Sequence, residues 1–253
     1  MKFTIITPNY NGSKYLEKCI ESVLSQNVDF EHIVVDGAST DSSLKILKKY
    51  PHLKVISEKD LGMYDAVNKG INMARGDIIS YINCDDRYPD GSLVKVLNAF
   101  SKNNNLDYVY GNCRLIDHLE NEIYVYKVPP TFNFLLKVIT VVPWAQPSIF
   151  YKRKVFDKIG FFDIKYLLAA DYHFMKRVIL FGFISLRVNT VLSNFMIRDD
   201  SLGSKYSKDM KSEGEQIKKV LGIKDKILFD LLYNIYRKIY NFHVFFNKKL
   251  NSL

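Results

Sequence analysis

The sequence predicts an α/β protein in which helices flank a mixed, mostly parallel sheet and a helical extension follows at the C-terminus. Short apolar runs alternate with segments of helical periodicity through the first hundred residues, as expected for repeated strand–helix units. Polar residues follow several of the apolar runs directly, and a basic, helix-like stretch occupies the end of the chain. We therefore expect one domain over residues 1–203 and an extension over residues 204–253.

Four strand–helix units make up the first half of the domain. Strands are expected over residues 3–7, 33–36, 54–57 and 77–82, and each precedes a helix with one apolar face. Asp41 is placed to cap the second helix. The apolar faces are Leu16, Ile20, Val23 and Leu24; Leu44, Ile46 and Leu47; Met63, Ala66, Val67, Gly70, Ile71 and Ala74; and Leu93, Val94, Leu97 and Phe100.

The second half of the domain changes to an antiparallel pattern. Residues 107–110 and 123–126 flank a polar turn at Glu120 and Asn121, which predicts a hairpin and therefore a mixed sheet. The elements expected after it are a short helix following Pro129 and Pro130, a strand over residues 148–151 and a helix over residues 171–181.

Composition limits the kind of protein this can be. The 253 residues are 47% hydrophobic and 25% charged, which fits a folded chain with a large core. The three cysteines (Cys19, Cys84 and Cys113) are odd in number and far apart, so neither a disulfide framework nor a four-ligand zinc site is expected. Met1 leads directly into a strand without an apolar signal-peptide core, so we expect a cytoplasmic protein.

Unusual polar residues follow the first, second and fourth predicted strands. In open α/β sheets ligands bind outside the carboxyl ends of the strands, so these loops are expected to meet in one cleft. No Gly-x-Gly-x-x-Gly and no phosphate-binding P-loop follows the first strand, which argues against dehydrogenases and P-loop kinases. The loops are Thr7-Pro8-Asn9-Tyr10-Asn11, Asp36-Gly37 and Asp85-Asp86.

Asp36 and Tyr10 have the chemistry of a site for a pyrimidine base. A carboxylate at Asp36 can accept the imide N–H of a uracil-like base while the Tyr10 ring packs on that base. The alternative is that Asp36 is the aspartate of an ordinary Asp-Gly turn.

Asp85 and Asp86 offer adjacent carboxylates directly after an apolar strand. Mg²⁺ and Mn²⁺ prefer oxygen ligands and are usually held by one or two carboxylates together with substrate phosphates. The alternative is an acidic loop before the Pro-Asp-Gly helix start.

Asp171 lies in an apolar segment with no cation one helical turn away. Burial would raise the pKa of this carboxyl and make it a better base, although an N-cap role is an equal alternative. The histidines His32, His52, His118, His173 and His243 form no pair at metal-ligand spacing, and only His173 lies close to Asp171 in sequence.

Four ordered segments resemble the family 2 glycosyltransferases of GT-A fold. They are Ile-Thr-Pro-Asn-Tyr-Asn at residues 6–11, Val-Val-Asp-Gly-Ala-Ser-Thr-Asp at 34–41, Gly-Met-Tyr-Asp-Ala-Val-Asn-Lys-Gly at 62–70 and Asn-Cys-Asp-Asp at 83–86. The third segment is similar to that of enzymes of bacterial capsule, colanic-acid and O-antigen assembly. The resemblance covers about residues 1–200.

The resemblance implies a metal-dependent, inverting hexosyl- or N-acetylhexosaminyltransferase. Such an enzyme moves a sugar from a UDP-sugar to a hydroxyl of a saccharide acceptor, expected to be lipid-linked, in cell-surface polysaccharide synthesis. It implies that Asp171 is the general base and that Asp86 binds Mn²⁺ or Mg²⁺. For Lys69 a plain helix-surface lysine is the alternative. The implied nucleotide-sugar site is Thr7, Pro8, Tyr10, Asp36, Asn68, Lys69 and Asp85, and the implied acceptor site is Trp144, Gln146 and His173.

Three positions depart from the family pattern. Asn83 stands where many relatives have the first acid of an Asp-x-Asp, Ala170 where they often have Glu, and Ala145 where His is frequent. A second hypothesis is therefore a catalytically weak nucleotide-sugar-binding or scaffold protein of an envelope-assembly complex.

The basic charge is concentrated in the extension. The chain has a net charge of +9, and residues 202–253 hold 11 Lys/Arg against 5 Asp/Glu. No nucleic-acid-binding motif accompanies it, so nucleic acid is not expected as a partner. Residues 227–253 combine an amphipathic helical pattern with cations, which predicts binding to an anionic membrane at the inner face of the cytoplasmic membrane. The alternative is packing on the domain or on a second copy in a homodimer.

Overall fold

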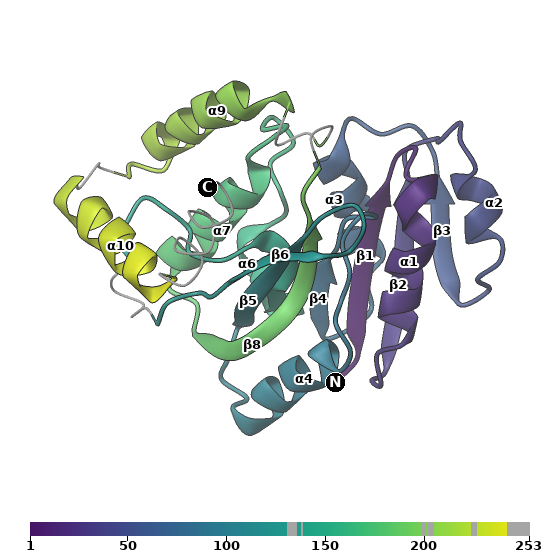
Figure 1. The fold of residues 1–253 in the computed structure, drawn as a ribbon, viewed down its shortest axis with the longest axis horizontal. Helices are drawn as coiled ribbons and strands as arrows, with labels where there is room; N and C mark the ends of the chain where they lie inside the picture. The colour runs from purple at the N-terminus through teal and green to yellow at the C-terminus, as the bar shows by residue number, and fades with distance from the viewer. Residues whose placement is uncertain (131–135, 138, 199–200, 202–204, 224–226, 242–253) are drawn as a thin grey trace.

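The computed structural model describes residues 1–130, 136–137, 139–198, 201, 205–223 and 227–241 (Figure 1). The first half alternates β1 (Phe3–Asn9), α1 (Ser13–Leu24), β2 (Phe30–Asp36), α2 (Ser43–Leu47), β3 (Leu53–Ser57), α3 (Met63–Met73), β4 (Ile78–Tyr81) and α4 (Ser92–Lys102). The second half contains β5 (Tyr108–Ile116), β6 (Glu122–Tyr126), the 3₁₀-helix η1 (Gln146–Ser148), β7 (Ile149–Lys152), α6 (Arg153–Ile159), α7 (Ala170–Phe181), β8 (Ser185–Met196), α9 (Ser207–Val220) and α10 (Ile227–Tyr240).

One eight-stranded sheet runs through the domain in the order β3-β2-β1-β4-β7-β5-β6, with β8 paired to β5. Strands β1 to β4 are parallel, whereas β7 is antiparallel to both β4 and β5. The predicted mixed, mostly parallel sheet and the β5–β6 hairpin are confirmed. The hairpin reaches further than expected, because β5 continues to Ile116.

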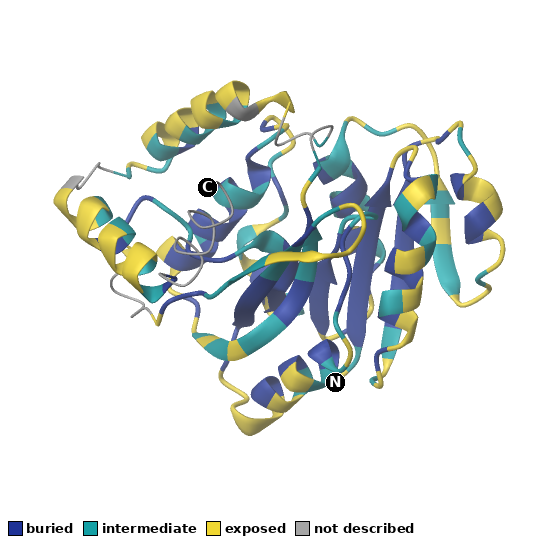
Figure 2. Ribbon diagram, in the orientation of Figure 1, coloured by how far each residue is buried: buried dark blue, intermediate teal, exposed yellow. Residues whose placement is uncertain are grey.

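Helices cover both faces of the sheet. Neighbouring residues of β1 point to opposite faces, so they contact different helices. Ile5 packs in a cluster with residues of α1 and α4, and Ile6 packs in another with residues of α3, α6 and α7. Gly70 lets α3 approach β1 closely, since a Cβ at this position would lie 2.4 Å from the Ile6 side chain. Strands β1, β2 and β4 are accordingly almost entirely buried, whereas β3, β6 and much of β8 are only partly buried or exposed (Figure 2).

One local prediction differs from the structure, two elements were not predicted, and one prediction falls mostly on residues that are not described. Asp41 does not occupy the N-cap of α2, which is Ser42; it accepts the Ser43 and Ser13 backbone N–H groups, each at 2.9 Å, and so links the starts of α1 and α2. The elements β8 and α6 were not predicted. The short helix expected after Pro129 and Pro130 lies mostly outside the described residues.

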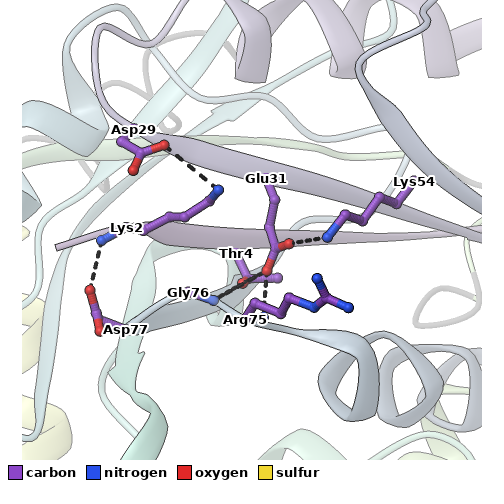
Figure 3. A network of polar contacts seen from close by, with 8 residues as sticks. All are labelled: Lys2, Thr4, Asp29, Glu31, Lys54, Arg75, Gly76 and Asp77. Carbon is purple, nitrogen blue, oxygen red and sulfur yellow. Dashed lines mark hydrogen bonds and ion pairs between the residues drawn. The ribbon is translucent and has the colours of Figure 1, made fainter.

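A buried carboxylate joins the amino ends of the strands (Figure 3). Glu31 on β2 accepts hydrogen bonds from Thr4 Oγ1 at 2.6 Å, Lys54 Nζ at 2.5 Å and Gly76 N at 3.1 Å. Burial alone would raise the pKa of Glu31, but the hydrogen bonds from Lys54, Thr4 and the Arg75 backbone outweigh it and hold the pKa at about 2. This cluster fixes β1, β2, β3 and the turn before β4 to one another.

Candidate active site

Two adjoining cavities open beyond the carboxyl ends of the parallel strands, where a ligand is expected in an open α/β sheet. The larger cavity has a volume of about 670 Å³ and is lined by the loops after β1 and β4, the start of α3, the start of α7 and the chain after β8. The smaller cavity has a volume of about 420 Å³ and is lined by β5, β6, the segment before η1 and α10. The residues that line both are Met63, Tyr64, Asn83, Asp171 and Phe195.

One end of the larger cavity is formed by an aromatic ring and a carboxylate. Tyr10 is 68% exposed and lines the cavity together with Pro8 and Asp60. A Cβ on Gly37 would lie 2.5 Å from Asp60 Oδ2 and 3.4 Å from the Tyr10 ring, so both side chains crowd against this glycine. Asp60 Oδ1 accepts the Gly62 N–H at 2.9 Å. The ring and the carboxylate can therefore face a planar ligand together.

Asp36 lies behind this end of the cavity and does not line it. Its buried carboxylate accepts hydrogen bonds from Asn9 Nδ2 at 2.7 Å, Ser39 Oγ at 2.5 Å, Ser39 N at 3.0 Å and Ser57 Oγ at 2.7 Å. Burial alone would raise its pKa, but these hydrogen bonds lower it. Asp36 thus ties together the ends of β1, β2 and β3, which is the turn role left open by the sequence.

Thr7 is also turned away from both cavities. Its side chain is fully buried, and its hydroxyl forms a hydrogen bond with His32 Nε2 at 2.9 Å. Burial lowers the pKa of His32 to about 3, so this histidine is neutral. Thr7 therefore belongs to the interior between β1 and β2.

The two adjacent aspartates point in different directions. Asp85 lines the larger cavity, and its Oδ2 forms an ion pair with Arg198 Nη2 at 2.9 Å. Asp86 is buried and accepts the Met196 N–H at 3.0 Å and Asn83 Nδ2 at 3.3 Å. Burial and the charge of Asp85 raise the pKa of Asp86 well above its ordinary value. The structure places Asp85 at the cavity surface and Asp86 behind it, so the predicted metal ligand is not the exposed one.

The carboxylate of Asp85 suits a divalent cation that is completed by a ligand. Within the described part of the chain, no group of three His, Cys, Asp or Glu side chains is arranged to hold a metal. Mg²⁺ commonly takes only one or two protein carboxylates and completes its shell with substrate phosphates and water. One carboxylate facing an open cavity fits that kind of site.

Asp171 stands where the two cavities meet, in the first turn of α7 and not at its N-cap, which is Ala169. Its Oδ1 accepts the Tyr172 N–H at 2.7 Å. Burial is the largest influence on Asp171 and raises its pKa, with a smaller contribution from the negative charge of Glu213. A carboxylate with a raised pKa between two cavities is placed to move a proton between their contents.

The start of α7 is held by a residue of the extension. Glu213 on α9 accepts the Leu167 N–H at 3.0 Å and the Leu168 and Ala169 N–H groups at 2.9 Å each. These are backbone donors next to the free N–H groups of a helix start, which favour a negative charge. The position of Asp171 therefore depends on α9.

Asn68 and Lys69, which belong to the segment at residues 62–70, line neither cavity. Asn68 holds the Phe162 backbone through hydrogen bonds of 2.8 and 3.1 Å. The Lys69 ammonium pairs with Glu58 at 2.9 Å and Asp65 at 3.4 Å, as in the surface-lysine alternative.

The three predicted acceptor residues are divided. Trp144 and Gln146 line the smaller cavity, where the Trp144 indole N–H donates to Met175 Sδ at 3.0 Å and Gln146 Nε2 donates to the Tyr81 carbonyl at 2.8 Å. His173 packs on Tyr166 and lines neither cavity. Burial lowers its pKa to about 4.

Sequence reasoning missed Asp60, Arg198 and Arg237, all of which line a cavity. Asp60 follows the third strand, so the rule applied to the other strand ends would have found it. Arg198 follows β8, which was itself missed, and Arg237 comes from α10 in the extension. No signal in the sequence links Arg237 to the cavity.

Helix α10 packs on the domain with one face and exposes apolar side chains on another. Asp230 accepts the Thr140 N–H at 2.7 Å and the Thr140 hydroxyl at 2.8 Å, Tyr233 is buried, and the Asn241 amide bonds the Lys127 backbone at 2.9 Å. The packing alternative thus accounts for one face. Among the described residues no helix is long and apolar enough to cross a membrane. The exposed aliphatic and phenylalanine residues are Leu228, Phe229, Leu231, Leu232, Ile235 and Ile239.

Known proteins with similar sequences are glycosyltransferases. A glycosyltransferase of PGL/p-HBAD biosynthesis from Mycobacterium bovis is 30% identical over 179 residues, which are 68% of this chain and 67% of that protein. Chondroitin synthase of Escherichia coli is 35% identical over 125 residues, which are 47% of this chain and 18% of the synthase.

Solved structures of low sequence identity share the fold. Staphylococcus aureus TarS 1–349 in complex with UDP matches with a TM-score of 0.64 at 19% identity, over 82% of this chain and 63% of that one. The mannosyltransferase PcManGT from Pyrobaculum calidifontis, in complex with GDP-Man and Mn²⁺, matches with a TM-score of 0.63 at 18% identity, over 88% of this chain and 64% of that one. The chain thus spans less than two thirds of these solved chains. Its α/β fold is the GT-A fold.

A comparison with protein-family models identifies the family. Residues 4–162, which contain the loops after β1, β2, β3 and β4, match the model of Glycosyl transferase family 2. The chain therefore belongs to glycosyltransferase family 2.

Proposed function

We propose that the chain transfers a sugar from a UDP-sugar to a hydroxyl of a saccharide acceptor with inversion, in the synthesis of a cell-surface polysaccharide or glycolipid. The observation that carries the proposal is the place of Asp171. It lines both cavities, so one cavity can take the donor and the other the acceptor on either side of a single base. The names of the mycobacterial relative and of chondroitin synthase support the product class.

The donor lies in the larger cavity with its base between Tyr10 and Asp60. The Asp60 carboxylate accepts the imide N–H of uracil, and the Tyr10 ring covers the face of the base. Asp36 cannot take this role without giving up one of its four hydrogen bonds. It instead holds the loops that carry Tyr10. TarS has been solved with UDP and with UDP-GlcNAc, which supports a uridine donor.

The diphosphate lies towards Asp85 and Arg198. Asp85 would hold Mn²⁺ or Mg²⁺, and the bound cation would neutralise the charge that develops on the departing diphosphate. Arg198 adds a permanent cation beside the same carboxylate. PcManGT was solved with Mn²⁺, which supports the choice of metal.

Transfer of the sugar needs a group that accepts the proton of the acceptor hydroxyl, and it needs the hydroxyl to attack the anomeric carbon from one defined side. Asp171 takes the proton of the acceptor hydroxyl while the oxygen of that hydroxyl forms a bond to the anomeric carbon. The bond from that carbon to UDP breaks in the same step, and its electron pair leaves with UDP. Attack from the side opposite to UDP inverts the configuration, and burial of Asp171 matches its basicity to this task.

The exposed apolar face of α10 fits a lipid-linked acceptor at an anionic membrane surface. Leu231, Ile235 and Ile239 are 54%, 46% and 67% exposed, which is costly in water. Such a face binds at the boundary of headgroups and acyl chains on the cytoplasmic side. A second copy of the chain is the other occupant to test.

A screen of UDP-glucose, UDP-galactose and their N-acetyl forms tests the function by Mn²⁺-dependent release of UDP. Asp171→Asn should bind UDP almost normally while turnover falls by about 100-fold or more, the usual worth of a general base. The product of the wild-type enzyme should have the anomeric configuration opposite to that of the donor by NMR. Binding of a UDP-sugar without release or transfer would favour the scaffold alternative, and a retained configuration would contradict the role of Asp171.

A further inference from the structure

A cation from the C-terminal extension reaches the smaller cavity. Arg237 lies on α10 and lines this cavity together with Tyr124, Tyr126, Trp144 and Gln146. Arg237 is one of the cations of residues 227–253, for which the sequence predicts contact with an anionic membrane. The structure instead puts it in the wall of the cavity that also contains Asp171.

The packing of α10 fixes the direction of Arg237. Asp230, Tyr233 and Asn241 are spaced at helical intervals around it and all contact the domain, through Thr140, the core and the Lys127 backbone respectively. Residues at such intervals share one face of a helix. Arg237 is therefore on the packed face, whereas Lys238 next to it is exposed.

The charge of Arg237 is not neutralised by a carboxylate in the described part of the chain. Among the described residues that line the smaller cavity, Asp171 is the one acid and Arg237 the one base. The Tyr126 hydroxyl beside Arg237 donates to the Pro143 carbonyl at 2.9 Å, so it offers Arg237 only a neutral oxygen. A partly buried guanidinium without an ionised partner retains the capacity for a bidentate bond to an anion.

The remaining wall suits a sugar ring. Trp144 packs against Tyr110 with ring centroids 4.3 Å apart and the rings tilted by 34°, and it lines a cavity that also contains Tyr124 and Tyr126. Ligand cavities of this kind combine aromatic walls with a few polar groups that fix orientation. Here the polar groups are the Gln146 amide, the Asp171 carboxylate and the Arg237 guanidinium.

We propose that the smaller cavity selects an acceptor saccharide that carries an anionic oxygen group, a carboxylate or a phosphate, and that Arg237 binds this group. The inference rests on the proposed function, because it assigns the acceptor to this cavity. It makes α10 part of the acceptor site. Arg237 selects the acceptor, and Asp171 activates its hydroxyl.

The single tryptophan of the chain offers a test that does not need turnover. Because Trp144 lines the smaller cavity, its fluorescence should report occupancy of that cavity. The probes are glucuronate for a carboxylate, glucose 6-phosphate for a phosphate, glucose as the neutral control and sulfate as the anion without a ring. Arg237→Gln removes the cation, and Lys238→Gln on the exposed neighbour is the matched control.

We expect a saturable fluorescence change with glucuronate or glucose 6-phosphate at concentrations about 10- to 100-fold below those needed with glucose, as one charge-assisted bidentate contact provides. Which acid saturates first identifies the source of the anion. The preference should vanish in Arg237→Gln, remain in Lys238→Gln and be partly kept in Arg237→Lys. Equal saturation by glucose, a response to sulfate alone, an unchanged preference in Arg237→Gln or no response to any probe would overturn the inference.

A failure of the proposed function would appear in UDP binding and UDP release rather than in the fluorescence titrations. UDP binding is measured by calorimetry on the same variants, and Arg237→Gln should leave it unchanged because Arg237 does not line the larger cavity. Loss of UDP binding in this variant would contradict the separation of the two sites. A wild-type protein that binds the anionic probes but releases no UDP would contradict the transferase activity while leaving the anion site intact.

Discussion

Separate replacement of Asp36 and Asp60 by asparagine distinguishes the carboxylate that holds the loops from the one that we propose to contact the uracil ring. Each oxygen of Asp36 accepts two hydrogen bonds: Oδ1 from Asn9 Nδ2 and Ser39 Oγ, and Oδ2 from Ser39 N and Ser57 Oγ. An amide keeps one of these oxygens and replaces the other with a donor. Two hydrogen bonds to an ionised acceptor are therefore lost in Asp36→Asn.

The two substitutions should change different quantities, Asp36→Asn the stability of the fold and Asp60→Asn the affinity for UDP. A hydrogen bond to a charged group contributes about 1.5–3 kcal/mol. Loss of two such bonds in Asp36→Asn should lower the free energy of unfolding by about 3 kcal/mol. We take the lower value for each bond because a serine hydroxyl can turn to accept from the new amide. Asp60→Asn keeps the Oδ1 contact to Gly62 and should change stability by less than about 0.5 kcal/mol. Its affinity for UDP should fall roughly 10- to 100-fold, the worth of the lost contact to the base.

Urea unfolding and titration calorimetry with UDP and Mn²⁺ measure these two quantities on the same preparations. CDP is the matched ligand, because cytosine presents an acceptor where uracil presents the imide N–H. Asp60→Asn should therefore reduce the preference for UDP over CDP. The reasoning fails if Asp60→Asn binds UDP like the wild type while a stably folded Asp36→Asn does not.

Three further predictions concern the pKa of Asp171, the hydrogen bonds of Glu31 and the exposed apolar face of α10. Glu213→Gln removes a charge that raises the pKa of Asp171, so the acid limb of the pH–rate profile should move to lower pH, and an unmoved limb would refute the coupling. Glu31→Gln should cost about 3 kcal/mol of unfolding free energy at pH 7, because the folded pKa of about 2 lies below the ordinary 4.5. That cost should shrink as the pH falls from about 4.5 to 2 in urea titrations; a pH-independent difference would contradict it. Serine at three exposed positions of α10 should leave unfolding unchanged but reduce sedimentation with anionic liposomes, and unaltered sedimentation would favour another occupant; the positions are Leu231, Ile235 and Ile239.

The sequence was sufficient for elements whose signal is local. The four strand–helix units have apolar runs and helical stripes that can be recognised without knowing their neighbours. Strand β8 has only a weak signal, because polar and apolar residues alternate over residues 185–189 but not over the rest of Ser185–Met196, and its place comes from parallel pairing with β5. The helix α6 is too short to show a clear period. Long-range pairing therefore had to come from the structure.

For the site, sequence reasoning found the region better than the individual groups. Strand ends located the cavity, and Tyr10, Asp85 and Asp171 line it. It could not tell which of the adjacent Asp85 and Asp86 faces the ligand, because the direction of a side chain in an irregular loop depends on the backbone. The contacts from α9 and α10 were not predictable either, since nothing local relates a helix of the extension to the loop it touches. The predicted boundary between residues 203 and 204 remains a prediction.

Strand β2 carries a buried acid near each of its ends, Glu31 and Asp36. Each collects donors from both neighbouring strands, so β1, β2 and β3 are fastened twice without any contribution from α9 or α10. The Tyr10–Asp60 end of the larger cavity therefore stands on a frame made by the strands, while the part of the smaller cavity that contains Arg237 depends on α10, which follows the last strand of the sheet. In evolutionary terms the two ends can change at different rates. If the proposed function holds, exchanging α10 between relatives should transfer acceptor preference and leave the affinity for UDP unchanged.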